Sequence, residues 1–180
     1  MKKYIKQIIK EIIPVILGIL IALFINNWNE ERKDKAYVTK AYLSIKKDLT
    51  ETNKKIKENF KKQQILLDTV NKYINDDKLT LLEVMVKANG LNFPSIKTNS
   101  WKALSNSKIE LLDYKKVILL SNIDDGKELL DKKVQYILNF TYNNVKKTEK
   151  EKKELLKLYL REIIVTEKGL QEEIEKIINE

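Results

Sequence analysis

Residues 8–28 read IIKEIIPVILGILIALFINNW, and residues 12–25 within this stretch carry no polar or charged side chain. As an α-helix with a rise of ~1.5 Å per residue, the stretch is about 31 Å long, which matches the ~30 Å hydrocarbon core of a bilayer. Lipid offers no partners to an unpaired backbone, so such a segment crosses a membrane as a helix. We therefore predict a basic N-terminal tail over residues 1–7 and a transmembrane helix over residues 8–28.

Polar side chains flank the apolar run at both ends. Lys10 and Glu11 lie at its start, and Asn26, Asn27 and Trp28 follow it. Lysine extends its amine toward water, and tryptophan collects at the boundary between acyl chains and headgroups. We assign these five residues to the two membrane interfaces.

Two further features of the run leave alternatives open. A basic tail before an apolar core is also typical of a cleaved secretory signal, but no small-residue cleavage site follows the run, which favours an uncleaved anchor. Gly18 and Ala22 form a small-xxx-small pair that would let a second span pack closely. Small residues are also simply tolerated in lipid, so this pair has two readings.

The composition excludes several classes of function. The 180 residues include no cysteine and no histidine, so a disulfide, a thiolate site, a histidine base and the usual zinc sites are excluded. With only 4 glycines and 2 prolines, the chain is expected to be all-α. Its net charge of +9 is spread among 26 acidic residues, which is typical of a solvated surface, so we do not expect nucleic acid as a partner.

Beyond the anchor, apolar side chains recur at helical spacing over residues 29–75, where no proline or glycine interrupts the pattern. The stripe consists of Val38, Tyr42, Ile45, Leu49, Ile56, Phe60, Leu67, Val70 and Ile74. This spacing predicts a long stalk helix that continues the transmembrane helix as one rod. The stripe must be covered by another helix, from this chain or from a copy of it.

The chain after the stalk changes in composition. Residues 76–126 are densely apolar and are punctuated by Asn89-Gly90 and Pro94, which predicts short helices joined by turns. We expect this segment to form a small helical cap at the distal end of the rod. The turn Asp124-Asp125-Gly126 closes it.

A second apolar stripe predicts a long return helix over residues 127–167. It consists of Leu130, Val134, Ile137, Thr141, Val145, Thr148, Leu155, Tyr159 and Ile163. Stalk and return helix would form a long antiparallel hairpin with its open end at the bilayer. Gly169 would then break the chain before a short C-terminal amphipathic helix, residues 168–180, that packs on a neighbouring helix or subunit.

The most polar parts of the two long helices, residues 50–59 and 146–153, are expected to face each other. The second part has five lysines and two glutamates, so the pair would form a basic waist that holds an anion. The simpler alternative is a solvated ring with ion pairs along each helix.

Few residues are candidates for chemistry. Phe93, Trp101 and Tyr114 are candidates for lining a ligand pocket in the cap, although aromatic residues more often form core. Asp76-Asp77 and Asp124-Asp125 fall near one end of the predicted hairpin and suggest a metal, but acids are also ordinary turn formers. We expect no catalytic, cofactor-binding or metal-binding residue, and hence no enzyme.

Orientation depends on a near-equal count of basic residues. Four lysines precede the apolar run of residues 12–25, and one arginine and three lysines follow it over residues 32–40. The free amine of the tail tips the positive-inside rule toward an inside N-terminus and an outside domain.

The segment IPVILGILIALFINNWNEERKDK, residues 13–35, resembles the start of a family of uncharacterised bacterial single-span membrane proteins that carry a domain of unknown function. Its members open with a basic tail, a glutamate, an IGILIAL-type span and INNWNE. The segment TNSWKALSNSKIELL, residues 98–112, is similar to their middle motif but has Lys108 where a glycine is expected. The resemblance implies a single-pass protein of the bacterial cytoplasmic membrane with long helices, and it implies no activity.

Taken together, the sequence favours a non-enzymatic, membrane-anchored helical protein that acts as an oligomeric scaffold or interaction module. The expected partners are the lipid bilayer, further copies of the chain and a membrane protein. Two alternatives stay open. One is a ligand sensor that binds through the cap, and the other is an oligomeric, membrane-permeabilising defence effector.

Overall fold

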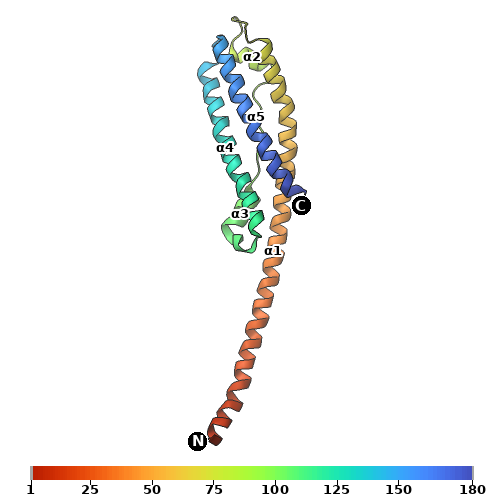
Figure 1. The fold of residues 1–180 in the computed structure, drawn as a ribbon, viewed down its shortest axis with the longest axis vertical. Helices are drawn as coiled ribbons and strands as arrows, with labels where there is room; N and C mark the ends of the chain where they lie inside the picture. The colour runs from red at the N-terminus through yellow and green to blue at the C-terminus, as the bar shows by residue number, and fades with distance from the viewer. Residues whose placement is uncertain (1, 180) are drawn as a thin grey trace.

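The computed structural model describes residues 2–179, with side chains from residue 10 onward. Over that range it contains five α-helices, one short 3₁₀ helix and no strand, which confirms the all-α prediction (Figure 1). The tail, residues 1–7, has no described side chains, so its predicted basic contacts lie outside the described residues. The four shorter helices, α2 to α5, form a bundle with the upper half of the long helix α1, as Figure 1 shows.

Helix α1 (Lys2–Lys72) is one unbroken helix of 71 residues. It therefore joins the apolar stretch and the stalk into a single rod, as the sequence predicts. Pro14 lies inside it, and no other proline or glycine interrupts it except Gly18. The helix ends shortly before Asp76, whose Oδ1 accepts the backbone N–H groups of Lys78 and Leu79 at 2.9 and 3.2 Å.

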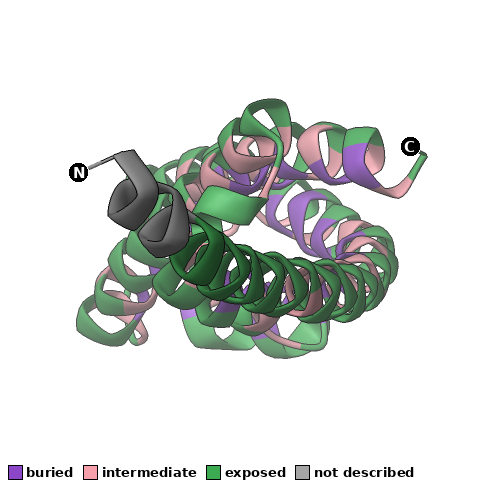
Figure 2. Ribbon diagram, turned by 90° about the horizontal axis from the view of Figure 1, so that it is seen from below, coloured by how far each residue is buried: buried purple, intermediate pink, exposed green. Residues whose placement is uncertain are grey.

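The lower half of α1 stands apart from the bundle. All large apolar side chains from Ile12 to Trp28 are exposed, with accessible fractions of 48–73 %. Figure 2, seen from the lower end, shows exposed residues along this part of α1 and buried ones only where helices face each other. The change from exposed to packed begins near Asp34, which is the first residue of α1 paired with the bundle.

The predicted distal cap over residues 76–126 is wrong in its arrangement. Only α2 (Leu81–Lys87) lies at the distal end, while α3 (Asn99–Lys108) and η1 (Ile109–Leu111) lie at the opposite end of the bundle. The chain between them is extended and descends along α1.

Specific hydrogen bonds fix this descending segment. Gln63 Nε2 donates to Asn92 O at 3.2 Å, and Lys97 N donates to Thr52 Oγ1 at 3.1 Å. The descent starts at Asn89-Gly90, where φ values of 63° and 83° turn the chain out of α2. Left-handed conformations of this kind favour asparagine and glycine.

The prediction of a single return helix over residues 127–167 is also wrong, because two helices occupy this part of the chain. Helix α4 (Tyr114–Asn144) rises from the lower end to the distal end and passes through Gly126 without a turn. Helix α5 (Lys150–Ile178) then descends and passes through Gly169, so no separate helix over residues 168–180 exists within the described chain.

The turn between α4 and α5 is held by the start of α2. Leu81 N donates to Lys147 O at 2.8 Å, and Leu82 N donates to Val145 O at 3.0 Å. Carbonyls near the end of one helix thus accept amides at the start of another, and both sets would otherwise lack intrahelical partners. This pairing ends α4 without a proline or a glycine.

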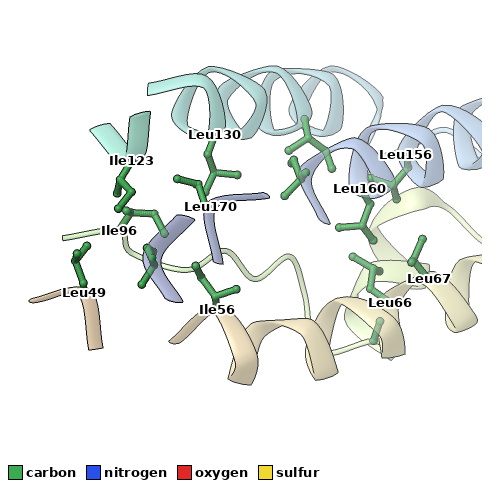
Figure 3. Packing of buried hydrophobic residues seen from close by; sticks show 14 of the residues in the cluster. Leu49, Ile56, Leu66, Leu67, Ile96, Ile123, Leu130, Leu156, Leu160 and Leu170 are labelled. Carbon is green, nitrogen blue, oxygen red and sulfur yellow. The ribbon is translucent and has the colours of Figure 1, made fainter. Parts of the chain in front are cut away.

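Helix α5 packs on both α1 and α4, and its buried positions repeat every three and four residues. Its buried positions are Lys153, Leu156, Leu160, Ile163, Glu167, Leu170, Ile174 and Ile177. This spacing is the seam of an antiparallel coiled coil, and the matching seam of α1 includes Ile56, Leu66 and Val70. Figure 3 shows leucines of α1 and α5 pointing toward one another, with Leu130 of α4 closing the core.

The predicted basic waist does not form. Asn53 Nδ2 donates to Glu175 Oε1 at 3.2 Å, so the polar part of α1 faces the end of α5 and not its start. The start of α5 lies at the distal end instead, where Lys153 Nζ donates to the carbonyl oxygen of Asp76. The prediction failed because it missed the turn after α4. The descending helix begins at Lys150 and not at residue 127, so residues 146–153 lie at the distal end and not halfway along the bundle.

Candidate membrane anchor and polar sites

Helix α1 is long and apolar enough to cross a membrane. An 18-residue apolar stretch of the helix carries at most two charged residues, and no part of that stretch is buried in the fold. The predicted interface residues Lys10, Glu11, Asn26 and Asn27 are exposed, as is Trp28. At the upper boundary, the guanidinium of Arg32 lies 5.7 Å from the ring centre of Trp28, one helical turn away.

Gly18 and Ala22 lie on the free part of α1. A methyl group placed on Gly18 would meet nothing within 4 Å, so this glycine makes no close approach inside the fold. The small-residue face is therefore open to lipid or to a second span.

The junction between α1 and the bundle is polar. Lys108 at the end of α3 forms an ion pair with Asp34, and Tyr37 Oη lies 3.0 Å from Ser107 Oγ. The Asp34 carboxylate raises the pKa of Lys108 above its usual value through the hydrogen bond that it accepts. Higher up, Ser100 Oγ donates to Asp48 Oδ2 at 2.7 Å. These contacts tie α3 to α1 directly above the exposed segment.

The three aromatic residues predicted to line a cap pocket lie on three different elements. Trp101 is buried beside a cavity of about 10 Å³, which has room for roughly one water, and neither Phe93 nor Tyr114 lines that cavity. Tyr114 is 76 % exposed at the start of α4. Trp101 lies in α3, Tyr114 begins α4 and Phe93 lies in the extended segment before α3, so a pocket shared by all three stays a prediction.

The paired acids also separate. Asp76 lies at the distal end, where its carboxylate caps backbone amides, and these hydrogen bonds hold the pKa of Asp76 below its usual value. Asp124 lies near the lower end, with its Oδ1 3.6 Å from Lys102 Nζ. No group of three or more metal-ligating side chains occurs among the residues that the structure describes.

Sequence reasoning missed two polar residues in the seam between α1 and α5. Lys153 and Glu167 are both fully buried, 14 residues apart, at positions where the repeat calls for an apolar side chain. Their spacing from Leu156 and Leu170 was the signal that would have identified them. Lys153 is satisfied by the carbonyl group of Asp76 at the end of α1.

Glu167 has a less complete set of partners. Gln63 Nε2 donates to its Oε1 at 2.8 Å, while Glu167 Oε2 and Gln63 Oε1 have no hydrogen-bond partner. Burial raises the pKa of Glu167 to about 7 against the opposing effect of the Gln63 hydrogen bond. A protonated carboxyl and an amide have complementary donors and acceptors, so protonation supplies the donor that this pair lacks.

An apolar groove at the distal end was also missed. It has a volume of about 270 Å³ between α2 and the end of α4, and its most exposed members are Val86 at 66 % and Tyr142 at 73 %. The groove exists only because α4 ends beside α2, which the predicted hairpin did not allow.

Comparisons with protein-family models, with curated proteins and with solved structures gave no match to this chain.

Proposed function

We propose that this protein is a non-enzymatic, single-pass membrane protein whose helical bundle serves as an interaction module held close to the bilayer. The observation that carries the proposal is that the apolar half of α1 leaves the bundle completely unburied on the same unbroken helix that forms the bundle's spine. Contiguous exposed apolar surface of this extent is typical of contact with a membrane or another protein. A bilayer matches its length and its polar ends.

The continuity of α1 favours an anchor over a cleaved leader. Residues that follow the apolar run belong to the same helix, and they reach the core without a turn or a loop. The proposed location is the bacterial cytoplasmic membrane, with the N-terminus inside and the bundle outside. The count of basic residues and the resemblance to single-span proteins support this location.

The proposed interaction role rests on surfaces other than the stalk stripe. Helix α5 covers that stripe within the same chain, so the stripe no longer calls for a second copy. Two surfaces stay open, namely the small-residue face at Gly18 and Ala22 and the distal groove at Val86 and Tyr142. We assign self-association to the first and contact with a membrane protein partner to the second.

Disulfide formation in membranes tests self-association, because the chain has no cysteine of its own. We expect the Ala22→Cys variant to oxidise to a dimer of twice the 21.2 kDa chain mass, because position 22 lies on the close-packing face. Leu20→Cys lies about 200° around the helix from Gly18, at ~100° per residue, and serves as the matched control.

A second pair of variants applies the same test to the bundle. We expect no dimer from Val86→Cys, because the distal groove is assigned to a different protein, and none from Val165→Cys on the outer face of α5, which is matched in exposure at 69 % against 66 %. A dimer at position 22 with none at position 20 supports association through the span. Absence of a dimer at position 22, under conditions that trap a known membrane dimer, would contradict the self-associating scaffold.

A further inference from the structure

The lower end of the bundle exposes a small apolar surface next to the exit of α1. It consists of Ile109 and Leu111 in η1 and Tyr114 at the start of α4, which are 38 %, 38 % and 76 % exposed. We call these three residues the foot. Figure 1 places the chain between α3 and α4 at the end of the bundle that faces the free half of α1.

The height of the foot above the anchor is fixed by contacts to α1. The Lys108–Asp34 ion pair and the hydrogen bond between Tyr37 and Ser107 hold the end of α3 against the helix. Leu111 shares a shallow groove of about 330 Å³ with Val38 and neighbouring residues of α1. The foot cannot rise along α1 unless these contacts break.

Helix geometry converts this position into a distance from the bilayer. Asp34 is six residues beyond Trp28, which corresponds to about 9 Å along the helix axis. The headgroup layer extends about 5–7 Å beyond the hydrocarbon core on each side, and transmembrane helices tilt by ~20° on average. With Trp28 at the boundary between acyl chains and headgroups, the level of Asp34 is about 2–4 Å beyond the headgroup layer, so the foot faces the outer edge of that layer.

The charge around the foot is balanced. Residues 28–35 and 108–116, which include the Lys108–Asp34 pair, together carry six basic and five acidic side chains and are close to balance. A balanced surface is neither repelled by anionic lipid nor dependent on it. Tyrosine beside aliphatic side chains is also the composition that collects in the headgroup region.

We propose that the foot rests on the headgroup layer of the leaflet from which α1 emerges, and that it gives the bundle a second contact with the bilayer. This inference rests on the proposed anchor, because without it nothing brings the foot to a membrane. The contact fixes the tilt of the bundle, since a body held at the helix and at one offset point cannot rock about the helix exit.

Fluorescence quenching by headgroup-labelled lipid tests the contact on the full-length chain in nanodiscs of zwitterionic lipid. A single fluorophore is placed at Glu110→Cys beside the foot, at Asn27→Cys to report anchor insertion, or at Lys146→Cys at the distal end. We expect several-fold stronger quenching at positions 27 and 110 than at position 146. The strong quenching at position 110 should persist when anionic lipid is added.

Substitution within the foot separates contact from mere proximity. Tyr114→Ser should reduce quenching at position 110, because without the tyrosine ring the bundle is free to tilt about the exit of α1 and the foot spends less time on the headgroups. Tyr142→Ser, which removes an equally exposed tyrosine at the distal end (73 % against 76 %), should leave it unchanged. Unchanged quenching in Tyr114→Ser would overturn the proposal.

A seven-residue helical insert between Asn29 and Glu30 gives an independent test. It lifts the bundle by about 10 Å and rotates it by only ~20°, so quenching at position 110 should vanish while quenching at position 27 persists. Quenching at position 27 without quenching at position 110 in the unmodified chain refutes the foot contact and leaves the anchor intact. No quenching at either position would refute the anchor itself, and the foot contact with it.

Discussion

Glu167 and Gln63 meet inside the seam between α1 and α5, where neither side chain reaches water. A carboxyl group in that position has lost its hydration and faces an uncharged amide, so the proton-bound form is favoured. Burial accordingly raises the pKa of Glu167 to about 7 from a usual 4.5. The folded chain therefore binds a proton that the unfolded chain releases between these two values.

This difference predicts that the bundle loses stability as the pH rises from 5 to 8. The stabilising contribution of protonated Glu167 is fully present below pH 4.5 and is lost as the pH passes through 7, with a total of up to about 3 kcal/mol. Urea unfolding of the full chain in detergent, followed by the fluorescence of buried Trp101, measures it. Glu167→Gln should remove the dependence in this range, whereas Glu172→Gln, on the exposed face of α5, should retain it.

Other carboxylates act in a lower range of pH. Hydrogen bonds to Lys97 and to the backbone hold the pKa values of Glu51 and Glu83 below their usual values, so their contributions are lost only on acidification below about pH 4.5. A rise in stability between pH 5 and 8 would therefore contradict the assignment to Glu167. Neither Glu167 nor Lys153 was identified in the sequence, because a lone charged residue at helical spacing was counted with the solvated face.

The helices α4 and α5 each contain one glycine, Gly126 and Gly169, and the two glycines have different surroundings. Both lie inside helices, although the sequence predicted a turn at the first and a break at the second. Gly126 is a contact position, since a methyl group placed on it would come within 2.7 Å of Leu170 Cδ2. Gly169 meets nothing within 4 Å.

Alanine at these two positions is expected to have opposite effects. Gly169→Ala should raise the free energy of unfolding by about 0.5–1 kcal/mol, because alanine restricts the unfolded chain and favours a helix. Gly126→Ala should lower it by about 1–2 kcal/mol, because overpacking against the buried Leu170 outweighs that gain. The same urea titration measures both, and a stabilising Gly126→Ala would contradict the close packing of α4 on α5.

The elements themselves were predictable to different degrees. The long helix α1 follows directly from an uninterrupted period in the sequence, and its apolar stripe supplies buried residues such as Ile45, Leu49 and Ile56. The turn from α4 to α5 was not predictable, because its hydrogen bonds come from Leu81 and Leu82, about 65 residues earlier. Local sequence carries no sign of a helix that ends on a distant partner.

The turn between α4 and α5 decides the topology of the chain. With it, the chain rises in α1, descends in the segment before α3, rises in α4 and descends in α5 (Figure 1). Without it, the same elements form an extended hairpin with an apolar stripe open to a second copy. The observed topology buries the stripe within one chain and leaves the free half of α1 as the principal exposed apolar surface.

In the proposed anchor, α1 passes as one helix from the lipid into the core of the bundle. An accessibility scan measures this directly, with one nitroxide-labelled cysteine at a time over residues 15–49 of the full chain in nanodiscs. We predict access to oxygen but not to a water-soluble nickel reagent on all faces over residues 15–25. Access to the nickel reagent should then begin near Trp28, and from about residue 41 protection should repeat every three to four residues. Nickel access over residues 15–25, or highly mobile labels over residues 29–33 that indicate a break in the helix, would contradict the account.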